Sequence, residues 1–238
     1  MEEKSALEKY QALLVDWVAP RFTPEMLKGN ESMPADECEL MDIVFQHFTE
    51  LTDCVDRLDL CLAFIKAPMP RRKGLKADDY LMYHITFYFQ EVYILNERFE
   101  SYAKSVLRLR KKRIGLEGVN ASPLDGLLER IRVALSSVVL VRGKHVHARA
   151  FRDEEMKELS TFSFLAIHAP ERNEWRALHR QLYSVARKTW VKRLTNNRES
   201  ITKLLNEFCE LMHEIVAGGD RSLLPNNSFK PKPLRGSA

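Results

Sequence analysis

The chain has 238 residues, of which 45% are apolar and only 9 are glycine, and its formal net charge at pH 7 is +4. This length is enough to bury a large core, and the scarcity of glycine and of alternating Val/Ile/Thr-rich runs disfavours a β-sheet protein. The uncharged apolar runs are too short for a transmembrane helix, and the acidic N-terminus lacks the pattern of a signal peptide. We therefore expect a cytoplasmic protein with no membrane partner.

The first predicted elements are amphipathic helices separated by proline-rich breaks at 19–37 and 67–74. Between and after these breaks, apolar residues recur at alternating steps of four and three, which holds their side chains on one stripe of an α-helix, as in a bundle. The two stripes are Val44, Phe48, Leu51, Val55, Leu58, Leu62 and Ile65, and then Leu81, Ile85, Tyr88, Val92, Leu95, Phe99, Tyr102, Val106 and Leu109.

A third stripe follows Ser122 and Pro123, which are suited to the N-cap and first position of a helix. It comprises Leu124, Leu128, Ile131, Leu135 and Val138. Helical spacing returns with Trp175, Leu178, Leu182 and Val185, and again with Ile201, Leu204, Phe208, Leu211 and Ile215. The polar run TNNRES at 195–200 leaves open whether the last two segments form one helix or two.

The C-terminal segment differs from the rest, because three prolines and no apolar periodicity follow Gly218 and Gly219. We predict a single all-α domain over residues 1–219, an up-and-down helical bundle of four to six helices, and a flexible basic tail over 220–238. The four cysteines form no CxxC pair, so we expect reduced, buried thiols.

Positive charge is concentrated in two stretches. Residues 104–113 contain six basic groups and no acid, and residues 172–198 contain eight basic groups and one acid. Such clusters suit a polyanion such as RNA, although a solvated helix face has the same composition.

The third predicted helix ends in an unusual polar run. If the helix continues past Val138, the next positions on its apolar stripe are Arg142 and His145. Burying an unpaired arginine is costly, so this helix end is expected at a cleft or at a junction with a second subunit. His147 lies five residues after Arg142, about 140° round an ideal helix. The two groups converge only if Gly143 loosens the turn, if the arginine reaches across, or if two copies meet in a dimer.

Arginine and histidine together supply the groups needed to cleave RNA without a metal. The imidazole of His147 titrates near neutral pH and can transfer the proton of a ribose 2′-hydroxyl. The guanidinium of Arg142 can bind a phosphate and stabilise the charge of the transition state. Further substrate-binding candidates are Lys144, His145, Arg149 and Arg152.

The run RGKHVH at 142–147 resembles the Arg-x4-His motif of the HEPN superfamily, the nucleotide-binding domain named for higher eukaryotes and prokaryotes. The helical pattern over roughly residues 40–165 is similar as well. The resemblance implies a bundle of four or five helices, often a homodimer whose two motifs meet in one cleft. In catalytic members the residues matched by Arg142 and His147 carry metal-independent endoribonuclease activity.

Two positions depart from the pattern of that superfamily. Gly143 stands where many active members have Asn, and Arg149 stands where antitoxin-paired toxins often have Tyr. His145 and His147 have the spacing of a metal pair on a strand, but on a helix their rings diverge and no acidic partner follows at a standard offset. No metal and no cofactor is therefore expected. Phe87, Tyr88, Phe89 and Tyr93 are suited to stacking on bases or, more simply, to a core or dimer interface.

Three functions fit these observations. The first is a cytoplasmic, homodimeric, HEPN-like endoribonuclease of defence or stress, with RNA as substrate and an antitoxin or other protein as a partner. The second is a non-catalytic binding or scaffold protein of the same fold. The third is a helical regulator that binds nucleic acid through its basic stretches without chemistry.

Overall fold

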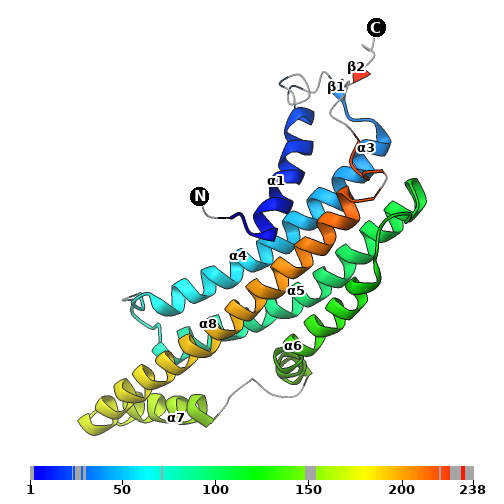
Figure 1. Ribbon diagram of the computed structural model, residues 1–238. Coiled ribbons are helices and arrows are strands. Elements are labelled where there is room, and N and C mark those ends of the chain that lie inside the picture. Colours follow the sequence, from blue (N-terminus) through cyan, green and yellow to red (C-terminus); the bar gives the residue numbers. More distant parts are fainter. Residues whose placement is uncertain are drawn as a thin grey trace. The chain divides into compact units, whose positions relative to one another are not determined.

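The computed structural model describes residues 3–22, 24, 28, 31–70, 72–147, 154–219, 221–225 and 232–233. In this part of the chain, six helices of 13 residues or more form the fold (Figure 1). They are α1 (Ala6–Val18), α4 (His47–Lys66), α5 (Ala77–Arg113), α6 (Ser122–His147), α7 (Glu154–His168) and α8 (Asn173–Ala217). The predicted all-α helical bundle is therefore confirmed.

The shorter elements lie near the ends of the chain. They are the 3₁₀ turn η1 (Ala19–Arg21), the helix α3 (Ala35–Leu40), the π-helical η2 (Met41–Gln46) and the strands β1 (Glu31–Ser32) and β2 (Lys232–Pro233). The two strands pair in antiparallel fashion.

The described chain divides into two compact units. The first combines Met1–Thr52, Glu97–Ile131 and Thr202–Ala238, and the second combines Asp53–Asn96 and Arg132–Ile201. Four helices, α4, α5, α6 and α8, each contribute residues to both units. The Arg-x4-His motif and the basic first half of α8 belong to the second unit.

The stripes predicted for α4 and α5 are confirmed in full. Every one of their residues, from Val44 to Ile65 and from Leu81 to Leu109, is buried. Burying one apolar stripe of each helix supplies the main driving force for packing these helices, at about 2 kcal/mol for each large side chain. Three of the four cysteines, Cys54, Cys61 and Cys209, are buried as free thiols, whereas Cys38 is exposed.

The stripes predicted for α6 and α8 are right only in part. In α6, Leu124, Ile131 and Leu135 are buried, but Leu127 is more deeply buried than Leu128. The run at 195–200 does not interrupt α8, which is one helix of 45 residues. In its first half Trp175, Leu178 and Leu182 are half-buried as predicted, but Val185 is exposed. The buried positions of that half are Ala186, Trp190 and Leu194.

In the second unit, α7 lies beside the first half of α8 (Figure 1). The ring of Phe162 in α7 contacts that of Trp175 in α8, with centroids 5.8 Å apart. Ser163 also donates a buried hydrogen bond of 2.9 Å to Asp78 at the start of α5. These contacts hold α7 against two other helices of its unit.

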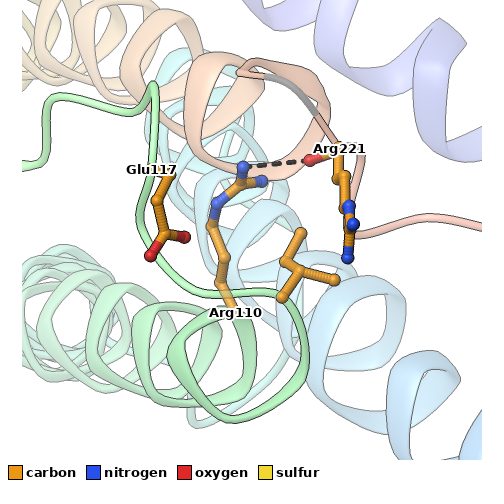
Figure 2. Close-up of a pocket in the computed structure, with 4 residues that line it drawn as sticks. Arg110, Glu117 and Arg221 are labelled. Carbon is orange, nitrogen blue, oxygen red and sulfur yellow. Dashed lines mark hydrogen bonds between the residues drawn. The ribbon is translucent and has the colours of Figure 1, made fainter.

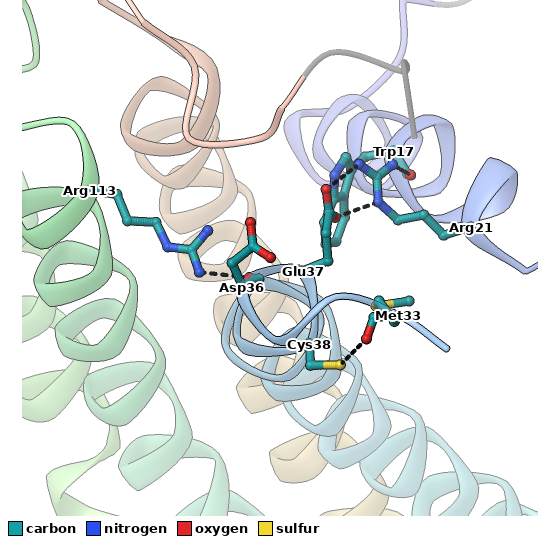
Figure 3. A network of polar contacts seen from close by, with 7 residues as sticks. All are labelled: Trp17, Arg21, Met33, Asp36, Glu37, Cys38 and Arg113. Carbon is teal, nitrogen blue, oxygen red and sulfur yellow. Dashed lines mark hydrogen bonds and ion pairs between the residues drawn. The ribbon is translucent and has the colours of Figure 1, made fainter. Parts of the chain in front are cut away.

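In the first unit, a buried arginine joins the end of α1 to α3 (Figure 3). Arg21 donates from Nε to Glu37 Oε2 at 2.8 Å and from Nη1 to the carbonyl of Trp17. Its guanidinium also lies over the ring of Trp17, 4.5 Å from the centroid. A fully buried charge needs such compensation, so we assign Arg21 to the stability of the fold.

The C-terminal boundary differs from the expected one. Leu223 and Leu224 are buried, although the predicted flexible tail begins at residue 220. The packed part of the chain therefore reaches beyond Gly219, because these two leucines give it apolar surface to bury. Residues 226–231 and 234–238 of the expected tail lie outside the described residues.

Candidate functional site

The Arg-x4-His motif occupies the last two turns of α6, which ends at His147. Arg142, Lys144, His145 and His147 are therefore helical positions. Their side chains, and the whole of Arg149 and Arg152, lie outside the described residues. These six positions remain predictions for the site.

The helix does not loosen at Gly143. Because α6 is unbroken to His147, Arg142 and His147 are rotated by about 140° from each other around one helix axis. One of the three routes that would bring these groups together is thereby removed. The remaining routes are the reach of the long arginine side chain and a second copy of the motif.

The apolar stripe of α6 loses its burial before it reaches the motif. Along this stripe Leu135 is buried and Val138 is only half-buried, and Leu140, which lies off the stripe, is 65% exposed. Val133 is also exposed and lies seven residues before Leu140, so both occupy one face of the helix. His147 is seven residues further on, and its position falls on the same face. Position 147 thus continues the face on which Val133 and Leu140 are exposed, whereas Arg142 lies on the apolar stripe.

Three of the six cations of the basic stretch 104–113 pair with carboxylates within the first unit. Lys104 pairs with Glu100, Lys112 Nζ lies 2.9 Å from Glu39, and Arg113 Nη2 lies 2.8 Å from Glu39. Hydrogen bonds from Arg113 and then Lys112 hold the pKa of Glu39 below its usual range. Ion pairs of this kind reduce the attraction of this stretch for a polyanion.

Arg110, another cation of the stretch 104–113, is almost fully buried (Figure 2). It donates to the carbonyls of Ile215, Gly218 and Arg221 at 2.7, 2.9 and 3.0 Å. Ile215 lies in the last turn of α8, and the other two residues follow the helix. A hollow of about 310 Å³ lies beside it, lined by Arg110, Ile114, Glu117 and Arg221. Because its Nη1 and Nη2 groups donate to these carbonyls, we assign Arg110 to capping α8.

The basic stretch 172–198 in the second unit is different. Arg198 pairs with Asp59 at 2.8 Å and Arg193 with Glu155 at 3.3 Å. Five other cations are exposed and, among the described residues, have no acidic partner: Arg172, Arg176, Arg180, Lys188 and Lys192. Arg176 and Arg180 are four residues apart, as are Lys188 and Lys192, so the members of each pair share a face of α8, and the two pairs are rotated by about 120° from each other around the helix axis.

The remaining arginine of this stretch, Arg187, closes the end of α4. Its Nε donates to the carbonyl of Ile65 at 2.7 Å, and its Nη2 donates to those of Lys66 and Ala67 at 2.5 and 3.0 Å. Helix ends leave such carbonyls without partners, and a cation also interacts favourably with the negative end of the helix dipole. Arg187 therefore fixes the α4 terminus against α8.

A hollow of about 330 Å³ lies at this junction. It is lined by Lys66, Ser184, Arg187, Lys188, Val191 and Lys192. Four of these six side chains are cationic and none is acidic, so the hollow favours an anion. Sequence patterns predicted the basic stretch but not this hollow, because Lys66 reaches it from another helix.

Of the four aromatic residues at 87–93, two belong to the core and two are half-buried. Tyr88 and Phe89 are buried, and Tyr88 donates to Asn197 Oδ1 at 2.9 Å. The exposed aromatic residues of this region are instead Phe64 and Tyr83, which lie off the apolar stripes of α4 and α5. Their exposure could have been predicted from the sequence, because a large ring that lies outside the apolar stripe of a helix does not face the core.

Within the described residues, no helix is long and apolar enough to span a membrane. No group of three or more His, Cys, Asp or Glu side chains suited to a metal ion is found in that part of the chain either. Compared with family models, curated proteins and solved structures, the chain matches none of them. The HEPN resemblance thus rests on the motif and the helical pattern of the sequence.

Proposed function

We propose that the protein is a homodimeric, metal-independent endoribonuclease that uses Arg142 and His147. The observation that supports it is the course of α6, which continues unbroken into the motif and leaves Val133 and Leu140 exposed on the face that also contains position 147. Exposed apolar side chains in line on one helix favour contact with another protein surface. A second copy bound there brings a second motif to the first.

In this proposal each motif residue has a chemical role. His147 takes the proton of a ribose 2′-hydroxyl or gives one to the leaving oxygen. Arg142 binds the scissile phosphate and stabilises its developing charge. Lys144, His145, Arg149 and Arg152 add attraction for the RNA backbone. No step requires a metal ion.

The proposal is tested with purified protein and mixed RNA in the presence of EDTA. We expect cleavage by the wild-type chain and its loss in both Arg142→Ala and His147→Ala. Matched controls are Arg108→Ala and His168→Ala, two exposed residues of the same types outside the motif, which should cleave like the wild type. Cleavage that survives in either motif variant, or none in the wild type, would overturn the proposal.

A second candidate function is RNA binding without cleavage. It is favoured by the exposed cations in the first half of α8, which have no acidic partner among the described residues. Salt-sensitive RNA binding in the absence of any cleavage would support it. If the protein neither cleaves nor binds RNA, and the motif variants lose self-association, a scaffold role takes precedence.

The proposal also assigns a setting to the activity. We place it in the cytoplasm, in defence or stress, under the control of an antitoxin or another protein partner. A nuclease that degrades cellular RNA would need such control. Co-purification of the tagged chain from its native cells, with and without ribonuclease treatment of the lysate, tests for a protein partner that does not depend on RNA.

A further inference from the structure

The C-terminal turn of α4 joins two surfaces of different chemistry in the second unit. On one side, the hydroxyl of Tyr80 donates to the carbonyl of Phe64 at 3.2 Å. On the other, Arg187 donates to the carbonyls of the next three residues, beginning with Ile65. Because these acceptors are consecutive, the aromatic residues around Tyr80 and the cationic hollow around Arg187 lie on either side of one helical turn.

The aromatic side is a cluster of stacked and exposed rings. Phe64 stacks on His84, with centroids 5.2 Å apart and planes inclined by 20°. Tyr83 and Tyr80 meet the same imidazole edge to face at 5.3 and 4.5 Å. Phe64 is 43% exposed and Tyr83 is 65% exposed, although rings of this size are usually buried. Tyr83 also stacks on Phe87, which holds it in a defined orientation.

The cationic side offers charge that other residues leave unused. Lys66, Lys188 and Lys192 line the hollow and are exposed, and no described acidic residue pairs with them. Arg187 is held by three backbone carbonyls, so it contributes charge in a fixed place. Arg176 and Arg180 lie eleven and seven residues before Arg187, within about 20° of its face of α8, and extend the positive surface along the helix.

We infer that this composite surface binds single-stranded RNA, with unpaired bases stacked on the Phe64–Tyr83–His84 cluster and backbone phosphates bound at the hollow. Exposed rings beside a positive groove are the two components by which proteins bind single strands without sequence preference. In a duplex the bases are stacked on each other and their faces are not accessible, so the aromatic cluster selects unpaired nucleotides. The inference shares with the proposed function only that RNA is the ligand.

Acidic protein segments are the competing class of partner, because they also satisfy the cations. They give the exposed rings no π-faces to stack on, and they leave the aromatic side unexplained. Single-stranded RNA uses both halves of the surface, which is why the combined chemistry favours it.

The experiment measures binding separately from cleavage. A short, fluorescein-labelled 2′-O-methyl RNA is titrated with the full-length chain in EDTA, because a methylated 2′-oxygen cannot attack the phosphate. We expect Tyr83→Ala to weaken binding by about tenfold, the usual effect of removing one stacking ring. Lys188→Gln combined with Lys192→Gln should lower the slope of log K against log salt by about 1.4, since each lost phosphate contact contributes about 0.7.

Matched controls separate this surface from general effects. Phe164→Ala removes another exposed aromatic ring of the same unit, and Arg108→Gln with Lys111→Gln removes two exposed cations of the first unit. Both controls should bind like the wild type. Circular dichroism of every variant checks that the helices remain formed.

Three results would overturn the inference: equal effects of Tyr83→Ala and Phe164→Ala, tighter binding of a duplex of the same sequence, or equal competition by polyglutamate. Its failure is distinguishable from that of the proposed nuclease. Loss of cleavage in His147→Ala with normal Tyr83-dependent binding supports both. If the chain binds single-stranded RNA through this surface but does not cleave RNA, the inference is supported and the proposed nuclease activity is not.

Discussion

At the scale of single residues, a pair of buried tyrosines closes the π-helical turn η2. Tyr102 donates its hydroxyl proton to the carbonyl of Val44 at 2.9 Å, so Tyr10, whose oxygen is 2.5 Å from that of Tyr102, must act as donor to it. Both hydroxyls are buried, and burial raises the pKa of each. The chain of bonds therefore holds a helical irregularity in the core with its polar atoms satisfied.

We predict that Tyr102→Phe lowers the free energy of unfolding by about 1–3 kcal/mol. The substitution leaves the Tyr10 hydroxyl without its acceptor and the Val44 carbonyl without the hydroxyl donor, while the packing volume is kept. Urea denaturation followed by circular dichroism measures the change. Tyr83→Phe removes an exposed hydroxyl and should alter stability by less than about 0.5 kcal/mol. Equal effects of the two variants would contradict this role for Tyr102.

His84 gives the fold a specific dependence on pH. Burial among the rings of Phe64, Tyr80 and Tyr83 lowers its pKa below the usual 6.5. The unfolded chain therefore binds the proton at a higher pH than the folded chain does. The stabilising contribution is complete above pH 6.5, is lost as the pH falls through that value, and levels off below the lowered pKa.

We predict that His84→Phe, which keeps a stacked ring but cannot be protonated, loses less stability than the wild type between about pH 7.5 and pH 5.5. Urea denaturation of both chains at the two pH values measures this difference directly. Other groups that titrate in this range contribute equally to both chains and cancel. An identical loss of stability in the two chains would show that His84 is not protonated more readily on unfolding.

At the scale of elements, the stripes of α4 and α5 were predictable because each helix buries one side that repeats at steps of four and three. Contacts in which a side chain caps a helix end distant in the sequence were not predictable. Arg110 belongs to the basic stretch 104–113, for which the sequence suggested a charged surface. It is instead buried and donates hydrogen bonds to carbonyls more than a hundred residues later. Its role depends on which helix end lies opposite, and no local spacing in the sequence contains that information.

We predict that Arg110→Ala destabilises the chain by about 3 kcal/mol, because three carbonyls at and beyond the end of α8 lose their donor. The contact also requires a glycine at position 219. Gly219 has φ 77°, and a Cβ atom there would lie 3.1 Å from Arg110 Nη2. Thermal and urea unfolding measure the loss. Arg108→Ala, on an exposed part of the same helix, is the control and should change stability by less than about 0.5 kcal/mol.

At the scale of the whole molecule, the sequence locates a candidate site without showing what completes it. The sequence leaves open whether the third helix continues past Val138, and the structure shows that α6 reaches His147, so Arg142 and His147 lie on a helix. The sequence did not show which cations remain available for a ligand. Lys112 and Arg113, for example, both pair with Glu39, which is distant in the sequence. The same holds for the hollow beside Lys66, which forms only when α4 and α8 meet.

The proposed nuclease requires a second copy, and the exposed face of α6 indicates where it binds. We predict that Leu140→Glu converts a dimer into a monomer and abolishes RNA cleavage, because a charge at that position opposes burial against a partner. Leu60→Glu is the matched control: Leu60 is 53% exposed on α4 in the same unit. Sedimentation velocity measures the association state and the EDTA cleavage assay measures the activity.

The two measurements together decide whether the site is shared between copies. If Leu140→Glu is monomeric and inactive while Leu60→Glu is dimeric and active, the motif depends on association through α6. A Leu140→Glu monomer that still cleaves would mean that Arg142 reaches His147 within one chain, across about 140° of helix. A Leu140→Glu dimer would exclude this face as the interface, because a buried glutamate carboxylate at its centre would cost several kcal/mol.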